Sequence, residues 1–208
     1  MHPNPAFRGE SADRNMAFAR ERGFGILTVG GADGPLVSHI PFVLNEAGNE
    51  LRAHIVRSNP IWRHLRDGGD ARAVIAISGP DGYISPDWYG VEDQVPTWNY
   101  VAVHLRGQLH LADEDSLRGH LETLSGSFET RLAPKPIWLT DKVSNDALAR
   151  MLRMIAPVAM SVEKIDGTWK LGQNKPANAA ANAADGLATS DIGQEISMLA
   201  DLMRSPVE

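Results

Sequence analysis

The segment "WNYVAVHLRGQLHLA" (98–112) alternates apolar and polar residues over most of its length. Val101, Val103 and Leu105 would lie on one face of a strand, with polar side chains between them on the other face. Because successive side chains of a β-strand point to opposite faces, this pattern predicts a long strand with one buried face. Gly107 interrupts the apolar face and predicts a bulge or bend, of the kind that barrels need.

Three shorter strands are predicted nearer the N-terminus. They cover residues 24–30, 35–44 and 51–56. The segments between them, "GADG" (31–34) and "NEAGNE" (45–50), are rich in Gly, Asp and Asn, which are typical turn residues. Short turns between successive strands indicate an antiparallel meander.

The remaining elements complete the predicted fold class. No run of alternating βαβ units is present, so we expect a mainly β fold with flanking helices (α+β), built as a closed or nearly closed antiparallel β-barrel. Strands are predicted at 71–78 and 157–167, with a turn at Gly167 into 168–172; helices at 11–22, 59–68, 113–129 and 144–155; and a loop at 79–96.

Composition limits the class of protein. The chain has 208 residues, 43% apolar and 22% charged, which is ordinary for a soluble globular protein with one large domain and at most a small appendage. No apolar run has transmembrane length, and "MHPNPAFRGE" (1–10) lacks a signal pattern, so neither a membrane span nor export is predicted. The absence of cysteine excludes disulfides and thiolate chemistry, and it is typical of the cytoplasm, which is the predicted location.

The charge argues against a general nucleic-acid binder. The formal net charge is −6, whereas such binding depends on neutralising phosphates. One basic cluster is present, made of Arg57, Arg63, His64, Arg66 and Arg72. A solvated helix face explains Arg63, Arg66 and Arg72, while a small phosphate site fits Arg57.

Polar residues gather where two predicted strands end and a helix begins. Free N–H groups at a helix N-terminus, with an arginine beside them, could form a phosphate cradle. A helix cap with a nearby surface arginine is the alternative. The residues concerned are Ser38, His39, His54, Arg57, Ser58 and Asn59.

A second group lies in "YISPDWY" (83–89) and "PTWNY" (96–100). Its aromatic residues could simply pack in the core or in an interface, which is common for Trp and Tyr. They could also form a wall for a flat conjugated ring, with hydrogen bonds from Thr97 and Asn99. The prolines stiffen this segment, which suits a preformed site.

Other motifs give weaker signals. "GFGILTVGG" (23–31) lacks the third glycine of a dinucleotide fingerprint and precedes a strand, so it is rejected. The histidines have no metal-ligand spacing, and no G-x-S-x-G elbow is present, so no metal site and no identifiable catalytic residue are predicted. "TWKLGQN" (168–174) places Lys170 and Gln173 beside a turn, either as a surface hairpin or as a polar lid over a ligand.

Four segments together resemble one family. They are "HIVRSNPIW" (54–62), "GPDGYISPDWY" (79–89), "VPTWNYVAVHLRGQL" (95–109) and "KLGQNK" (170–175). Their order and content closely resemble the PaiB-type proteins, called FMN-binding negative transcriptional regulators. The resemblance covers residues 3–175, and it departs from the family pattern at Gly172, where a serine is usual.

The resemblance implies a fold, a cofactor and an assembly. The fold would be the FMN-binding split barrel, shared with pyridoxamine-phosphate oxidases, over residues 1–175, and residues 176–208 would form an Ala/Asn-rich helical extension. FMN would lie at the subunit interface of a homodimer. The resemblance implies phosphate contacts from Arg57, Ser58 and Asn59 near His54; flavin contacts from Ser38, His39, Ile40, Thr97, Trp98 and Asn99; and contacts from the other subunit by Lys170 and Gln173.

Three functions follow as hypotheses. The first is a PaiB-type FMN-binding protein, acting as a negative transcriptional regulator or a flavin-dependent redox sensor, although neither charge nor motif supports direct DNA binding. The second is a flavin oxidoreductase for a small substrate or a haem-handling relative, in which FMN carries the electron chemistry. The third is a split-barrel scaffold without cofactor.

Overall fold

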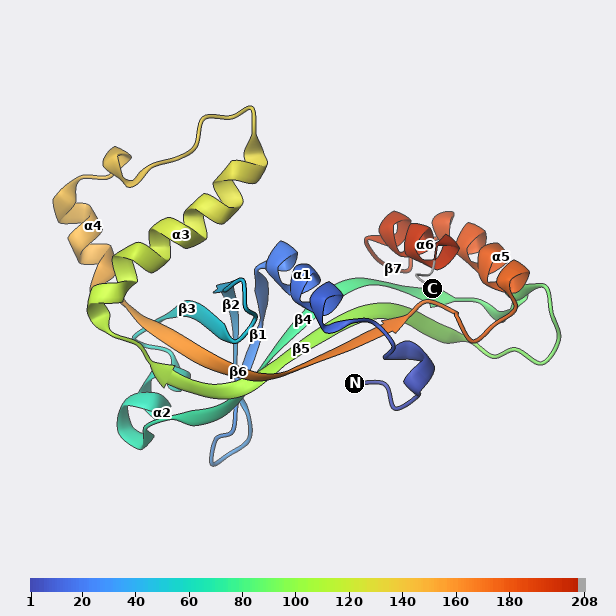
Figure 1. Ribbon diagram of the computed structural model, residues 1–208, viewed down its shortest axis with the longest axis horizontal. Helices are drawn as coiled ribbons and strands as arrows, with labels where there is room; N and C mark the ends of the chain where they lie inside the picture. The colour runs from blue at the N-terminus through green and yellow to red at the C-terminus, as the bar shows by residue number, and fades with distance from the viewer. Residues whose placement is uncertain (206–208) are drawn as a thin grey trace. The chain divides into compact units, whose positions relative to one another are not determined.

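The structure is a computed structural model that describes residues 1–205, and the chain divides into two compact units (Figure 1). The first, here called the barrel unit, consists of residues 16–76 and 105–165. The second, here called the capped unit, consists of residues 1–15, 77–104 and those from 166 onward. The domain boundary expected after residue 175 stays a prediction.

The barrel unit contains a closed ring of six strands. Strands β1 (Phe24–Val29), β2 (Leu36–Leu44) and β3 (Glu50–Val56) form the predicted meander. Three longer strands contribute one end each to the ring, and the hydrogen-bonded order is β1-β2-β3-β6-β5-β4, with β4 paired back to β1. The long strands are β4 (Ala71–Ile84), β5 (Thr97–Leu111) and β6 (Ile155–Lys170).

The predicted antiparallel barrel is therefore confirmed. The pairs β1–β2, β1–β4, β2–β3 and β3–β6 are all antiparallel. Alternate apolar residues of each strand fill the interior, as the period of two requires. Leu27, Leu51, Ile75, Leu105 and Leu109 have no exposed surface.

Gly107 allows two strands of the barrel to approach closely. A Cβ atom at this position would lie 1.8 Å from the backbone oxygen of Ser161 on β6. Strand β5 runs through Gly107 without a break. The glycine that interrupts the apolar pattern is thus explained by the close approach of a neighbouring backbone.

Helices accompany the barrel strands. In α2 (Pro60–Gly68), Asn59 caps the N-terminus by accepting a hydrogen bond from the Ile61 amide at 2.9 Å, and proline occupies the first position. Further along, α3 packs on β2 and β3. The other elements outside the sheet are α1 (Ala12–Arg22), η3 (Glu114–Ser116), α3 (Leu117–Glu129), η4 (Thr130–Leu132), η5 (Thr140–Lys142) and α4 (Asn145–Leu152).

In the capped unit, the C-terminal helices pack together. Helices α5 (Ala177–Ala188) and α6 (Ile196–Arg204) lie side by side, joined through the short strand β7 (Gly193–Gln194) (Figure 1). The alanines of α5 form a narrow buried face, which lets this helix approach α6 and the short helix η2 (Pro86–Tyr89) closely. Residues 206–208 of the predicted extension lie outside the described residues. The unit also includes η1 (Pro5–Phe7).

The predicted loop at 79–96 is wrong in its first part. Strand β4 continues to Ile84 because β7 pairs with it, placing Gly82 opposite Gly193. The Tyr83 amide also donates to the Ile192 carbonyl at 3.0 Å. The partner strand lies more than 100 residues away in the sequence. The Gly, Pro and Asp residues of this segment are typical of a loop, and no local pattern indicated that a distant strand would supply hydrogen bonds.

The turn predicted at Gly167 is also wrong. Strand β6 passes through this residue to Lys170. A Cβ atom at Gly167 would lie 2.0 Å from Oδ1 of Asn15, which accepts a hydrogen bond from the Trp169 indole at 2.9 Å. Glycine is needed here for side-chain packing within a strand.

No helix among residues 1–205 is long and apolar enough to cross a membrane.

We expect Gly107→Ala to destabilise the fold by about 1–3 kcal/mol, because the new methyl group would collide with the Ser161 carbonyl. Gly119→Ala in α3 is the control, since a Cβ atom there meets nothing within 4 Å and alanine favours helix by about 0.5–1 kcal/mol. Urea denaturation followed by circular dichroism measures both. A Gly107→Ala midpoint at or above that of the parent protein would contradict the close approach.

Candidate functional site

The structure brings together two residues of the predicted phosphate site, Ser38 and Asn59. Asn59 Nδ2 donates to Ser38 Oγ at 3.0 Å, which connects the start of α2 to strand β2. The Oδ1 atom of the same Asn59 caps α2 through the Ile61 amide. Asn59 therefore caps the helix, as one interpretation predicted, and it also positions a neighbouring hydroxyl, while the phosphate cradle stays a prediction. Ser58, between Arg57 and Asn59, is exposed.

Arg57 is held by partners that the sequence did not indicate. Its guanidinium group donates to both carboxylate oxygens of Glu114, at 2.7 and 2.6 Å, and to the Arg153 carbonyl at 3.2 Å. It lies beside a pocket of about 330 Å³ whose lining also includes Arg118. Both bonds come from one nitrogen, Nη2, so a carboxylate engages the Arg57 guanidinium where a phosphate could also bind.

His54 lies in a pair with a second histidine. Its Nδ1 is 3.2 Å from Nε2 of His120 on α3. Burial lowers the pKa of His54. For His120, burial first, and then the nearby charges of His54 and Arg52, lower the pKa to about 4. Both rings are therefore neutral near pH 7, and one donates to the other.

The other two predicted site residues on β2, His39 and Ile40, have different environments. His39 is exposed, and its ring stacks on Phe24 with centroids 6.4 Å apart. Ile40 is 3% exposed and belongs to the barrel core. Only backbone groups of Ile40 are thus available to a ligand.

In the capped unit, the "PTWNY" residues separate onto two faces of β5. Thr97 and Asn99 share one face with the buried Val101. Trp98 lies on the other face with its side chain 47% exposed, and its ring meets Tyr83 edge-to-face. Because neighbouring side chains of a strand point in opposite directions, Trp98 and Asn99 cannot both face one side of the same planar ring.

Lys170 meets the start of β5 within the same chain. Its ammonium group donates to Thr97 Oγ1, and to the Trp98 carbonyl at 2.7 Å. Partial burial, and then the charge of Lys175, lower the pKa of Lys170. The structure therefore brings together three predicted site residues: Thr97, Trp98 and Lys170.

Gln173 is engaged by its own turn. Its Oε1 accepts from the Leu171 amide at 2.8 Å, and its Nε2 donates to the Trp169 carbonyl at 2.6 Å. Gly172 has φ +85°, a left-handed conformation that favours glycine. The departure from the family pattern at Gly172 thus fits the local backbone, and the side chain of Gln173 serves the turn in this state.

Asn99 is the most buried polar residue of the predicted site, at 1% exposed. Its Nδ2 lies 3.5 Å from Sδ of Met203 on α6. Its Oδ1 has no hydrogen-bond partner among the described residues. A buried carbonyl oxygen without a donor is unusual and suits a ligand N–H group.

Three contact residues were missed by sequence reasoning: Glu114, His120 and Met203. Each lies more than 50 residues from its partner in the chain. The acidic first turn predicted for residues 113–129 was a signal for Glu114, although only as a helix-dipole effect. No local pattern marks His120 or Met203. Within residues 1–205, no three His, Asp or Glu side chains gather as metal ligands.

The histidine pair predicts a loss of stability in mild acid. Unfolded histidines titrate near pH 6.5, whereas the folded pair resists protonation, so the unfolded state binds more protons between pH 6.5 and about 4. Stability should therefore fall as pH falls through this window, by up to about 3 kcal/mol from His120.

His120→Gln should make this dependence shallower, measured as the urea midpoint from pH 4.5 to 7.5. His64→Gln on α2, outside the pair, is the control and should retain the parent slope. An unchanged slope in His120→Gln would show that the pair does not control the acid response.

Comparison with known proteins identifies the family. The family model described as "Putative FMN-binding domain" matches residues 1–164. The chain is 30% identical, over 171 residues, to the Bacillus subtilis (strain 168) protein named "Protease synthase and sporulation protein PAI 2", covering 81% of this chain and 80% of that protein.

Solved structures share the fold. The FAD and heme binding protein from Mycobacterium smegmatis superposes with a TM-score of 0.58 at 18% identity, covering 90% of this chain and 82% of that chain. The flavocytochrome Anf3 from Azotobacter vinelandii gives 0.53 at 15% identity, covering 81% and 72%. At such identities the likeness concerns the fold, which is the split barrel. Taken with the family match over most of the chain, these comparisons show that the protein belongs to the FMN-binding family of PaiB-type proteins, as the sequence resemblance predicted, with FMN as the family's cofactor.

Proposed function

We propose that this protein binds FMN through the two predicted groups of residues and acts as a flavin-dependent redox sensor in negative regulation. The observation that carries the proposal is the contact between Asn59 and Ser38. It fixes the start of α2 against β2, so that Arg57 and Ser58, the two residues before Asn59, stand at a helix N-terminus. Backbone N–H groups and the helix dipole favour an anion at such a position.

In the barrel unit, Arg57, Ser58 and Asn59 are proposed to hold the FMN phosphate. Glu114 would compete with the phosphate for the Arg57 guanidinium, because both are anionic acceptors of charge-assisted hydrogen bonds. The neighbouring flavin contacts are proposed for Ser38, His39, Ile40 and His54. Of these, burial lowers the pKa of His54, so its neutral ring would contribute a hydrogen bond and no charge near pH 7.

In the capped unit, the proposed contacts to the flavin ring are Thr97, Asn99, Lys170 and Gln173, together with Trp98, which lies on the opposite face of β5 and would have to meet the ring from a different side than Asn99. The chemistry of these residues fits the cofactor. The Asn99 carbonyl is buried without a donor, and a ring N–H would satisfy it. The exposed Trp98 offers a flat apolar surface. When bound, FMN supplies electron transfer, while these residues bind and orient it.

A homodimer with FMN at the subunit interface and a cytoplasmic location complete the proposal. Sensing without direct contact to DNA agrees with the formal net charge of −6 and with the absence of cysteine, which leaves the flavin as the redox-active group. The regulatory signal would then pass to a partner protein.

The phosphate site can be tested with Arg57→Ala. Loss of a charge-assisted hydrogen bond should weaken FMN binding by roughly 10- to 100-fold, measured by quenching of flavin fluorescence during titration. Arg63→Ala is the matched control, since Arg63 lies exposed on α2, the helix that begins just after Arg57. Equal affinities for Arg57→Ala and the parent protein would remove Arg57 from the site, and a parent protein that takes up no FMN would refute the cofactor proposal.

The indirect mode of regulation predicts no specific DNA binding. At physiological salt, fluorescence anisotropy should give equal, weak binding to a labelled operator fragment and to a random fragment of the same length, because the net charge repels the phosphate backbone. A preference for the operator of tenfold or more would establish direct repression.

A further inference from the structure

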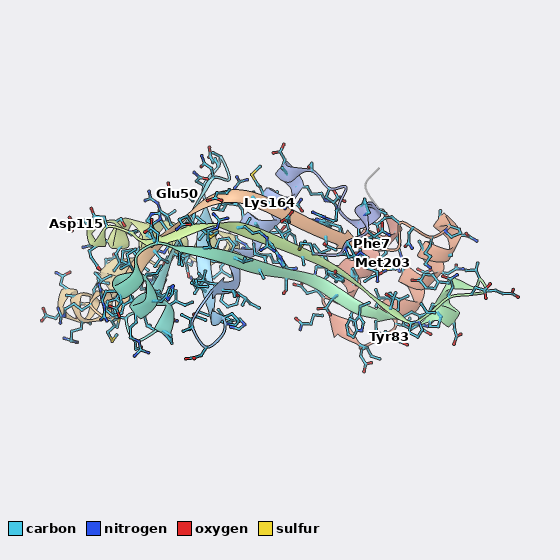
Figure 2. All side chains as sticks on the ribbon, turned by 90° about the horizontal axis from the view of Figure 1, so that it is seen from below. Phe7, Glu50, Tyr83, Asp115, Lys164 and Met203 are labelled. Atoms are coloured by element: carbon cyan, nitrogen blue, oxygen red, sulfur yellow. The ribbon has the colours of Figure 1, made fainter. Side chains whose placement is uncertain are left out.

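Helix α6 covers a predicted cofactor residue. Met203, labelled in Figure 2, is 1% exposed and places its sulfur 3.5 Å from the Asn99 amide nitrogen. Asn99 is buried to the same degree, and its carbonyl oxygen has no partner among residues 1–205. As long as α6 stays in this position, no ligand can reach the Asn99 carboxamide.

The anchorage of α6 is small. Its buried side chains are Leu199, Ala200 and Met203. Arg204 pairs with Asp185 of α5, but both side chains are largely exposed, so this ion pair adds little. Although α6 packs on α5, a short helix with few buried apolar groups belongs to the part of a fold that opens most readily.

The residue before helix α6 has an unusual backbone conformation. Glu195, between β7 and α6, has φ 51° and ψ 42°, a left-handed conformation that is uncommon for a residue with a side chain. On its N-terminal side, β7 is fixed to β4 by the pairing of Gln194 with Asp81. Strain is therefore located between an anchored strand and a weakly anchored helix, which is where a hinge would act.

We propose that α6 is a lid over Asn99, which opens when the flavin ring binds in the capped unit. The inference rests on the proposed FMN site. The family model ends at residue 164, so the lid is formed by residues outside the family match. The closed state leaves the Asn99 carbonyl buried without a donor, and a ring N–H would remove that penalty.

The lid would set the apparent affinity for the cofactor. If FMN binds only to the fraction of molecules in which α6 is open, the apparent dissociation constant for FMN equals the intrinsic one divided by that fraction. Weakening the closed state should then tighten FMN binding, which is the opposite of what the loss of a cofactor contact would do. The direction of the change in FMN affinity therefore distinguishes a lid from a helix that forms a wall of the site.

Hydrogen–deuterium exchange on the full chain tests the opening directly. On saturation with FMN, amides of residues 196–204 should exchange faster, while those of 145–152 in α4, which belongs to the barrel unit, serve as the internal control and stay unchanged. Unchanged or slower exchange over 196–204 in protein shown to hold FMN would overturn the lid.

A matched pair of variants tests the affinity. Met203→Ala removes the contact to Asn99 and should tighten FMN binding about fivefold or more, whereas Met198→Ala, at a 38% exposed position of the same helix, should bind as the parent does. Affinity in Met203→Ala that is equal to or weaker than in Met198→Ala would refute the lid. If neither the parent nor Met203→Ala binds FMN, the proposed cofactor site fails as well, and binding by Met203→Ala alone would support both proposals.

Discussion

The pairing of β1 with β4 is the constraint on which the barrel depends. It joins Ile26 to Ala76 and Val29 to Ala73 and thereby closes a six-stranded ring. Without it, β1 would be the edge of an open sheet, with unpaired backbone groups exposed to water or to another chain. Closure also encloses the apolar face of every strand in the ring. Ser38 and His39 of the predicted phosphate site lie opposite Leu27 and Ile26 of β1 within this ring, so their position depends on the same strand.

Three long strands of the sheet contribute to both units of the chain. Strands β4, β5 and β6 each contribute one end to the barrel unit and the other to the capped unit. In the capped unit the apolar face of β5 receives α6, while the opposite face carries the exposed Trp98. Side chains of β5 alternate between its two faces. At one end of the strand this alternation builds the barrel wall, and at the other end it separates a buried face from an exposed one. One surface is covered by the chain itself and one is open to a ligand.

Partners from distant parts of the chain set the chemistry of the predicted site residues. Glu114 occupies the Arg57 guanidinium, His120 shares a hydrogen bond with His54, and Met203 covers Asn99. In each pair, a residue that a local pattern marks as functional is restrained by one that no local pattern marks. At the proposed site, binding a phosphate or a flavin ring would therefore require exchanging an internal partner for the ligand.

The sequence by itself determined the antiparallel barrel, because the alternation over 98–112 and the short turns between strands depend only on the geometry of the local chain. It also determined the caps of helices such as α2, and the motifs that mark the FMN-binding family. The tertiary structure alone decided the elements whose hydrogen bonds come from far away. Strand β4 extends past residue 78, where β7 pairs with Asp81 and Gly82, and β6 passes through Gly167, where the Asn15 side chain fills the space of a Cβ atom. It alone also placed Met203 on Asn99 and Glu114 on Arg57, since such contacts depend on how the chain returns on itself, and no local pattern of residues encodes that return.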